Sequence, residues 1–439
     1  MRLPRTLESA PSSWRWAAYR SLALAAALLA AELAPTEALG QAVVPSGFAD
    51  QLGVGGLSRP VGMAFLPDGR LLVIEQQTAR VRLIVNGAIS IVDPMGIVPG
   101  VNTSGEERGL LGIAVDPGWP TRPYFYTHST DAGPPSRVRI SRFTVTGDLS
   151  GTGNGALTFN PASRYDLLTA IPDNAFNHNG GTLRFGPDGM LYASLGEDAT
   201  PCAAQDTSSL RGVILRLDVS RLPSGAGGPP SPALITPADN PFAAVGSPKS
   251  KLIWLYGLRN PFRFHIDPAS DALFVADVGQ DTWEEVDWAP RGGGNFGWPI
   301  FEGFASYPGG CTANGSPIAP IYAYDHGSGN AVMSAGVYRK PTGALGGFPP
   351  EYEGDYFFSD YYSGDMWRLK RSGGTWSVAP AVPGQPSSAH WAGGLDSVSD
   401  YLLGPDGGLW YCNQSSGEIR RIAFSMPDTI PPSPITDLR

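Results

Sequence analysis

The most regular pattern in this chain is a repeated alternation of apolar runs and tight polar turns. In each repeat, an apolar run leads through a turn into a second apolar run. A further apolar run of the repeat then ends on Arg beside Ile or Leu. Short apolar runs bounded by such turns predict β-strands rather than helices. The turns are centred on Pro67, Pro117, Pro187, Pro268, Gly354 and Pro405. Six copies in one chain predict an all-β protein.

The spacing of these turns predicts a six-bladed β-propeller of four-stranded antiparallel blades. Successive turns are 50, 70, 81, 86 and 51 residues apart, whereas a four-stranded blade takes about 40–50 residues. We therefore expect loops to take up the surplus, and a degenerate fifth copy at residues 352–358. An early strand within residues 46–60 is expected to help close the ring against the last blade, because closure removes exposed sheet edges. A pair of β-sandwiches does not explain a repeat carried across the chain.

The two ends of the chain differ from this pattern. The first forty residues combine four arginines, an apolar run at residues 22–31 and small residues up to Gly40. This order is typical of a secretory signal peptide, since a membrane span takes ~20 apolar residues. The alternative is a buried or interfacial helix. We expect a signal peptide at 1–40, a propeller at 41–426 and a Pro-rich tail at 427–439, in a protein exported to the periplasm or outside the cell.

Composition narrows the possible classes of protein. Hydrophobic residues make up 42% of the chain and charged residues 16%, beside 56 Gly and 42 Pro. This allows a large core and excludes a coiled coil or a disordered chain. The net charge of −9 argues against a general nucleic-acid binder. Three cysteines, Cys202, Cys311 and Cys412, allow at most one internal disulfide, and the sequence leaves the pairing open.

Two loop motifs carry residues suited to acid–base or redox chemistry. His178 lies in an Asn-His-Asn-Gly-Gly run before the third repeat. A histidine at the mouth of a strand can take a proton from a substrate hydroxyl near neutral pH, or it can simply bond loop backbone. Arg259 and Asn260 precede the fourth repeat and offer a cation and an amide to an anionic or quinone-like group. The alternative for Arg259 is a structural ion pair.

A stretch rich in carboxylates, residues 277–287, follows the fourth repeat strands. Together with free carbonyls of the glycine-rich residues 292–299, it suits a hard cation such as Ca²⁺, which takes about six to eight oxygens. The spacing differs from that of an EF-hand, and a solvated acidic loop is the alternative. The chain has no G-x-S-x-G elbow, no H-E-x-x-H motif and no Walker motif, so the common hydrolase, zinc-protease and nucleotide-binding signatures are missing.

Taken together, these segments resemble the glucose/sorbosone dehydrogenase family, whose members are six-bladed propellers related to soluble quinoprotein sugar dehydrogenases. The matching segments occur in the family's order and cover nearly the whole chain after residue 40. They are Arg-Pro-Val-Gly-Met-Ala-Phe at 59–65, Glu-Glu-Arg-Gly-Leu-Leu-Gly at 106–112, His-Asn-Gly-Gly at 178–181 running into Gly-Pro-Asp-Gly at 186–189, Tyr-Gly-Leu-Arg-Asn-Pro at 256–261, Gly-Gln with Trp-Glu-Glu at 279–285, and Asn-Phe-Gly-Trp-Pro at 295–299.

The resemblance implies an oxidoreductase that oxidises an aldose or sugar-like aldehyde, with pyrroloquinoline quinone (PQQ) on the channel axis. His178 corresponds to the general base that removes a proton from the sugar C1 hydroxyl while hydride passes to PQQ. Arg259 and Asn260 correspond to the residues that contact the quinone. The resemblance also implies that Arg259 takes part in catalysis. Glu107 stands where quinone-binding members have Gln. The electron acceptor stays open.

The resemblance also implies bound Ca²⁺. The main-chain carbonyls of Gly279 and Gln280 correspond to those that bind the Ca²⁺ held with the cofactor. Glu285, with the carbonyl of Phe296, corresponds to a further Ca²⁺ site.

Some positions depart from the family pattern. Tyr362 stands where a cofactor-binding Lys is expected, and Ser397 and Ser399 stand where two Arg hold the cofactor's carboxylates. An Asp that follows the strand after the histidine appears as Glu197 or Asp198. Fewer cations leave the three carboxylates of PQQ poorly matched. Two hypotheses follow: a PQQ- and Ca²⁺-dependent sugar dehydrogenase, or a non-catalytic propeller of the same family that binds carbohydrate or protein.

Overall fold

The computed structural model describes residues 42–344 and 346–425, so the predicted signal peptide and Pro-rich tail lie outside the described residues. Nearly all regular structure here is β-strand, which confirms the all-β prediction. The helical pieces of the described part are short: η1 (Pro161–Ser163), η2 (Pro201–Gln205), α2 (Pro232–Ile235), η3 (Ser250–Leu252) and η4 (Pro350–Tyr352). No helix in these residues is long and apolar enough to cross a membrane.

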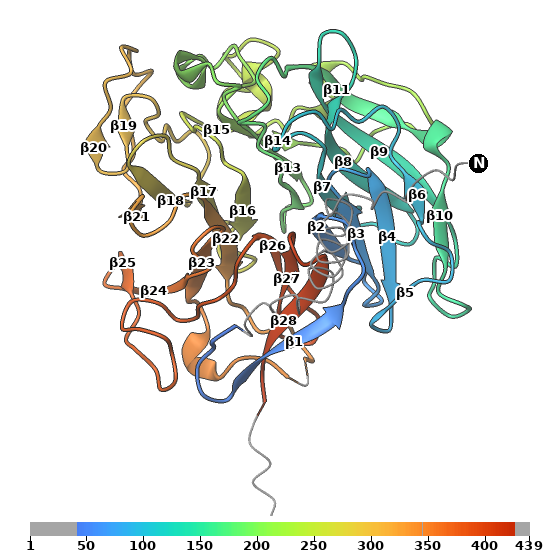
Figure 1. Cartoon of the computed structure of the whole chain (residues 1–439). Coiled ribbons are helices and arrows are strands. Elements are labelled where there is room, and N and C mark those ends of the chain that lie inside the picture. Colours follow the sequence, from blue (N-terminus) through green and yellow to red (C-terminus); the bar gives the residue numbers. More distant parts are fainter. Residues whose placement is uncertain (1–41, 345, 426–439) are drawn as a thin grey trace, which may run out of the picture. The chain divides into compact units, whose positions relative to one another are not determined.

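Six antiparallel sheets of the described residues are arranged as propeller blades around a centre (Figure 1), as the turn spacing predicted. The first blade contains β2 (Pro60–Phe65), β3 (Leu71–Glu75), β4 (Arg80–Val85), β5 (Ala88–Ile89) and β6 (Gly96–Ile97). The second contains β7 (Leu110–Val115), β8 (Tyr124–Asp131), β9 (Arg137–Gly147), β10 (Leu157–Phe159) and β11 (Tyr165–Pro172). The third contains β12 (Leu183–Phe185), β13 (Leu191–Leu195), β14 (Val213–Leu217) and β15 (Ile253–Tyr256).

The remaining blades follow the same order from the centre outwards. The fourth contains β16 (Arg263–Ile266), β17 (Leu273–Asp277), β18 (Trp283–Ala289) and β21 (Tyr322–Asp325), with the hairpin β19 (Phe301–Glu302) and β20 (Ala305–Ser306) in its last loop. The fifth contains β22 (Val332–Val337), β23 (Tyr356–Asp360), β24 (Met366–Ser372) and β25 (Thr375–Val378). The sixth contains β26 (Val398–Leu403), β27 (Leu409–Asn413) and β28 (Glu418–Phe424), and its outer strand is β1 (Phe48–Val54).

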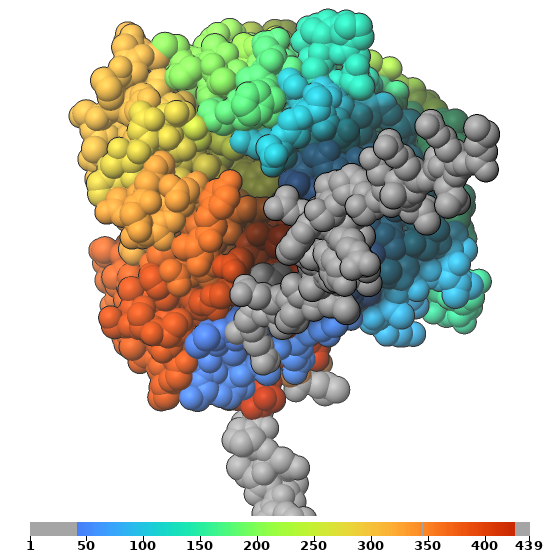
Figure 2. All heavy atoms as spheres, viewed as in Figure 1, coloured from blue at the N-terminus to red at the C-terminus, as the bar shows by residue number. Residues whose placement is uncertain are grey.

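The ring closes through the early strand that the sequence predicted. β1 pairs antiparallel with β28, with Phe48 opposite Phe424, and the register shifts once between Leu52 and Val54. Figure 2 shows this N-terminal strand region, in blue, beside the red C-terminal blade. The sixth sheet therefore joins the two ends of the described part of the chain, and unfolding one end must also break the other.

The hydrophobic core lies between the blades. In the described residues six apolar clusters form, and each joins the facing surfaces of two neighbouring blades. Because successive strand residues point to opposite faces, adjacent residues serve different clusters. Phe125 packs towards the first blade and Tyr126 towards the third. Each strand therefore contributes to two interfaces, which explains why apolar residues run almost without interruption along the inner strands.

The fifth blade shows what the repeat pattern missed. The segment at residues 352–358 leads into the second strand of that blade, β23, rather than the first. The inner strand is β22, which ends at Val337. A long connection containing η4 separates β22 from β23, so no compact Pro-Asp-Gly turn marks the pair. Strand order is therefore regular although the sequence signal is weak.

Candidate functional site

A cavity of about 330 Å³ lies at one end of the central channel. All six blades line it, because in an antiparallel blade the start of the first strand and the end of the second lie at the same edge. Those are the positions from which the lining comes: Arg59, Gln76, Glu106, Glu107, Asn177, His178, Arg259, Asn260, Phe262, Val278, Gly279, Asn330, Ala331, Met333, Tyr361, Tyr362, Ser399 and Gln414. Residues that are distant in the sequence therefore share one chamber.

His178 lies on the floor of this cavity in a left-handed backbone conformation, with φ of 59°. Its amide N donates to Oε2 of Glu107 at 2.7 Å. The loop packs closely on the end of β13, since a Cβ at Gly196 would lie only 2.0 Å from the carbonyl oxygen of His178. The His178 residue is 7% exposed. Loop geometry therefore fixes the ring while leaving it in contact with the cavity.

The neighbours of His178 determine its tautomer. Nδ1 is hydrogen-bonded to Oε1 of the fully buried Glu197, and a carboxylate can only accept. Nδ1 therefore carries the proton, and Nε2 presents its lone pair, which accepts from Nη2 of Arg259 at 2.8 Å. This arrangement leaves Nε2 as the atom that could receive a proton from a ligand hydroxyl.

The structure also decides which acidic residue accompanies the histidine. Glu197 holds the ring, and its amide N donates to the carbonyl of Arg259 at 2.9 Å. Asp198 points elsewhere and accepts from Asn174 and from Arg211. The sequence had left Glu197 and Asp198 as alternatives.

The backbone amides of Arg259 and Asn260 are both bonded to one buried carboxylate. Asp277 accepts from the amide N of Arg259 at 2.8 Å and from that of Asn260 at 2.7 Å. The Arg259 guanidinium donates to Oε1 of Gln280 at 2.7 and 3.0 Å and to the carbonyl of Val278 at 2.6 Å. Burial lowers the pKa of Arg259 below its usual value, against the nearby carboxylates. A cation is thus presented at the cavity floor in a fixed direction.

Polar residues that the sequence did not single out form one wall. The Tyr361 hydroxyl donates to Gln414 at 2.7 Å, and Gln414 donates to Oε1 of Gln76 at 2.9 Å. Gln76 in turn donates to the carbonyl of Glu106 at 2.8 Å. The chain of hydrogen bonds crosses four blades. No local motif marks these residues, because each is a single polar position just after a strand.

The predicted metal positions separate into two places. Gly279 lines the cavity, and the side chain of Gln280 holds Arg259. Glu285 lies deeper in the fourth blade, where its Oε2 accepts from the amide N of Gly303 at 2.8 Å. Phe296 and Gly303 line a separate small recess, which brings Phe296 into the neighbourhood of Glu285.

Glu285 belongs to a buried group of three carboxylates. Ligand atoms of Asp277, Glu285 and Asp287 lie within 4.8 Å of one another. Burial raises the pKa of Asp277 to about 7 and raises those of Glu285 and Asp287 well above their usual range. Neither carboxylate oxygen of Asp287, which is 0% exposed, has a hydrogen-bond partner. Buried carboxylates need a compensating charge or protons, so this donor set fits a hard cation.

The rim of the cavity is less well matched to an anionic cofactor. Among the described residues that line it, the arginines are Arg59 and Arg259, and the carboxylates are Glu106 and Glu107. Their formal charges cancel. Tyr362, 67% exposed, and Ser399 line it without charge, while Ser397 is not part of the lining and donates its amide N to Tyr361. The floor fits a quinone, whereas the rim supplies little positive charge for three carboxylates.

Comparison with known proteins relates this arrangement to a family. The family model described as Glucose / Sorbosone dehydrogenase matches residues 57–421. HIPL1 protein of Arabidopsis thaliana is 38% identical over 216 residues, which are 44% of this chain and 29% of HIPL1. Aldose sugar dehydrogenase YliI of Escherichia coli is 29% identical over 261 residues, 58% of this chain and 62% of YliI. The chain therefore spans less than two thirds of the length of each.

A solved structure agrees in fold along nearly its whole length. The PQQ-bound form of aldose sugar dehydrogenase from Streptomyces coelicolor aligns with a TM-score of 0.63 and 26% identity, over 87% of this chain and 99% of that chain. The family match, the six-bladed ring and the shared fold agree with one another. The chain therefore belongs to the glucose/sorbosone dehydrogenase family.

Proposed function

We propose that this protein is an exported quinoprotein-type oxidoreductase that oxidises an aldose or a sugar-like aldehyde. The observation that carries the proposal is the His178 imidazole, held between the buried Glu197 carboxylate and the Arg259 guanidinium on the cavity floor. A base with one nitrogen fixed by a carboxylate and the other facing a cavity is the arrangement used for general base catalysis. Family membership supports an oxidoreductase.

The residues of the chain would share the work as follows. Nε2 of His178 receives the hydroxyl proton, after the Arg259 guanidinium has moved from Nε2 to an oxygen of the bound ligand. Glu197 then stabilises the charged imidazolium through Nδ1. Arg259 and Asn260 supply donors to oxygens that gain negative charge, which is where preorganised donors contribute most to rate.

PQQ is the cofactor we propose for this site. When bound, it would supply a two-electron acceptor for the oxidation. Arg259, Asn260 and Glu107 would contact it, and the carbonyls of Gly279 and Gln280 would hold a Ca²⁺ beside it. The binding residues act from the floor, so affinity is expected to be modest because the rim lacks matching cations.

Cofactor binding provides the direct test of this function. Calorimetry with purified apoprotein, Ca²⁺ and PQQ is expected to show weak binding whose affinity falls between about 0.01 and 1 M salt, as the Debye length shrinks from ~30 to ~3 Å. Glu107→Gln is expected to tighten binding by roughly five- to tenfold, since it removes a like charge at close range.

Arg59→Gln provides the opposite comparison, because Arg59 is a cavity cation that lies 4.0 Å from the exposed Glu106. It should weaken binding and flatten the salt dependence. No binding at about tens of micromolar PQQ, with no dye reduction for any aldose, would reject the enzyme.

Calcium is expected at the carboxylate group formed by Asp277, Glu285 and Asp287. A ligand that binds only the folded state at a hundredfold excess over its Kd stabilises it by ~2.7 kcal/mol. Thermal unfolding should therefore move upward with millimolar Ca²⁺ and return with chelator. Asp287→Asn, in β18, should remove most of the shift. Asp281→Asn should keep it, because Asp281 lies in the connection before β18 and is bonded to the Tyr307 hydroxyl. An unchanged midpoint in the parent protein would exclude the metal.

A second candidate is a non-catalytic propeller that binds carbohydrate or protein at the channel mouth. The uncharged Tyr362 and Ser399 in the cavity lining favour it. It becomes the better description if calorimetry detects a neutral saccharide in this cavity but no PQQ.

Export is the location that we propose from the first forty residues. The intact mass of protein recovered outside the cytoplasm should correspond to a chain whose N-terminus lies near Gln41. Cytoplasmic protein that retains Met1 would contradict it.

A further inference from the structure

Beneath the active-site arginine, one buried side-chain amide joins three separate segments. Gln205 ends η2 and is 7% exposed. Its Nε2 donates to Oδ1 of Asn295 at 3.0 Å and to the carbonyl of Trp298 at 2.7 Å. Its Oε1 accepts from Nδ2 of Asn295 and from the amide N of Asn314, both at 2.9 Å. Both donors and both acceptor positions of the amide are therefore used.

Two of these segments are hydrogen-bonded to the backbone that precedes Arg259. The amide N of Gly257 donates to the carbonyl of Ala204 in η2 at 3.0 Å, and its carbonyl accepts from the amide N of Trp298 at 2.9 Å. Gly257 has φ of 75°, and a Cβ there would lie 2.0 Å from Oδ1 of Asn295. This position accordingly requires glycine. Any movement of η2 or of residues 295–298 would shift the chain two residues before Arg259.

The same group of residues also contacts the guanidinium itself. The Arg259 Cζ lies 5.7 Å from the centroid of the Trp298 indole ring, which is 2% exposed. Gln205 holds the carbonyl of that tryptophan. The indole limits how far Arg259 can turn away from Nε2 of His178.

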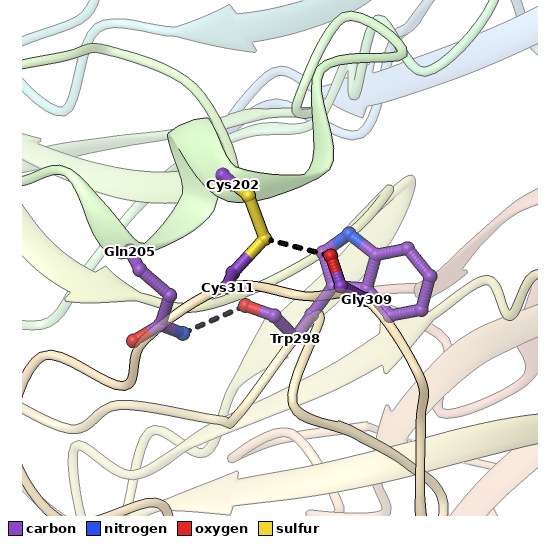
Figure 3. Close-up of a disulfide and its surroundings, with 5 residues drawn as sticks. All are labelled: Cys202, Gln205, Trp298, Gly309 and Cys311. Atoms are coloured by element: carbon purple, nitrogen blue, oxygen red, sulfur yellow. Dashed lines mark hydrogen bonds between the residues drawn. A yellow bond between two sulfur atoms is a disulfide. The ribbon is translucent and has the colours of Figure 1, made fainter.

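A disulfide closes this arrangement from the surface (Figure 3). Cys202, in η2, is bonded to Cys311, three residues before Asn314, with a Cα–Cα distance of 5.5 Å. Asn314 returns to η2 through its Nδ2, which donates to the carbonyl of Gln205 at 3.1 Å. Cys202 is exposed, whereas the free Cys412 is fully buried. A soluble reductant would thus reach this bond before it reached Cys412.

We propose that Gln205 is a positioning residue for Arg259 and that the Cys202–Cys311 disulfide keeps Gln205 in place. The inference rests on the proposed function in so far as Arg259 and His178 form its reactive site. A small dithiol reduces the bond by thiol–disulfide exchange, giving up two electrons and two protons to form the two cysteine thiols while it becomes a disulfide itself. Reduction then loosens Gln205 and Trp298, and the contact between Arg259 and His178 weakens.

The test uses three forms of the apoprotein: the parent protein after dithiol treatment, the Cys202→Ser/Cys311→Ser variant, and Gln205→Met. Methionine keeps the length of glutamine but cannot form its four hydrogen bonds. The matched control is Gln385→Met, because Gln385 also fastens a loop, through Val382 and Ser387, but lies in the loop after the fifth blade. Dithiol treatment changes no residue, so it keeps the test valid if a variant fails to fold.

Two readouts separate positioning from a merely structural role. Amide exchange across residues 255–262 should become faster by roughly five- to tenfold, the change expected when one buried hydrogen bond is lost. The ¹⁵N resonance of Nε2 in His178, assigned with His178→Gln, should move towards that of a free acceptor nitrogen. Gln385→Met should change neither.

Faster exchange with an unmoved Nε2 resonance would leave Gln205 as a structural residue and overturn the proposal, as would no change in either. Both readouts use protein without cofactor, so a failed dye assay would reject the proposed function while leaving this inference standing.

Discussion

His178→Ala is expected to lower the turnover number for aldose oxidation, assayed with PQQ, Ca²⁺ and a dye acceptor, by roughly 10²–10⁴, the usual contribution of a general base. The physical reason is the loss of Nε2, the cavity-facing nitrogen whose lone pair is set by the bond from Nδ1 to Glu197. The measurement is the steady-state rate at saturating substrate, with the melting temperature recorded for each protein.

His390→Ala is the matched control. His390 also faces a carboxylate, Asp365 at 3.2 Å, but it lies half-buried outside the cavity lining. Its loss should leave turnover within about twofold, because surface ion pairs contribute little. Activity that survives His178→Ala would keep the enzyme and discard His178 as its base.

The second large effect concerns a buried arginine that joins the blades. Arg263→Met is expected to lower the free energy of unfolding by about 3–5 kcal/mol, the range found when a buried charge network loses one partner. Arg263 is 1% exposed and donates to the carbonyls of Ser399 at 2.6 Å, Leu111 at 3.2 Å and Val61. These carbonyls belong to the inner strands of three other blades. Methionine would fill the space but leave them without a donor.

Urea unfolding with linear extrapolation measures this change. Arg184→Met is the comparison. Asp400 lies 2.6 Å from Arg184 and 3.5 Å from Arg263, but Arg184 is more exposed and donates only to residues of the sixth blade and to a carbonyl of its own strand. Its effect should be clearly smaller. A loss below about 1 kcal/mol for Arg263→Met would show that the blades close without this arginine.

Much of the candidate site could be predicted because its chemistry is carried by short contiguous motifs. The run around His178 and the pair Arg259–Asn260 each stand next to an inner strand, and strand order brings them to one edge. The wall formed by Tyr361, Gln414 and Gln76 could not be predicted. Gln414 lies 53 positions from Tyr361 and 338 positions from Gln76, and the three residues meet only when the blades are side by side.

By itself, the sequence determined the class and number of blades, because apolar runs and Pro-Asp-Gly turns encode strand pairs within a few residues of one another. It also determined the early strand that closes the ring. The tertiary structure alone decided relations between distant segments: the pairing of Cys202 with Cys311 over 109 positions, the choice of Glu197 over Asp198, and the role of Arg263. The local sequence pattern determines strands and turns, because these depend on residues close together in the chain. The relations between distant segments depend on which blades face each other around the channel.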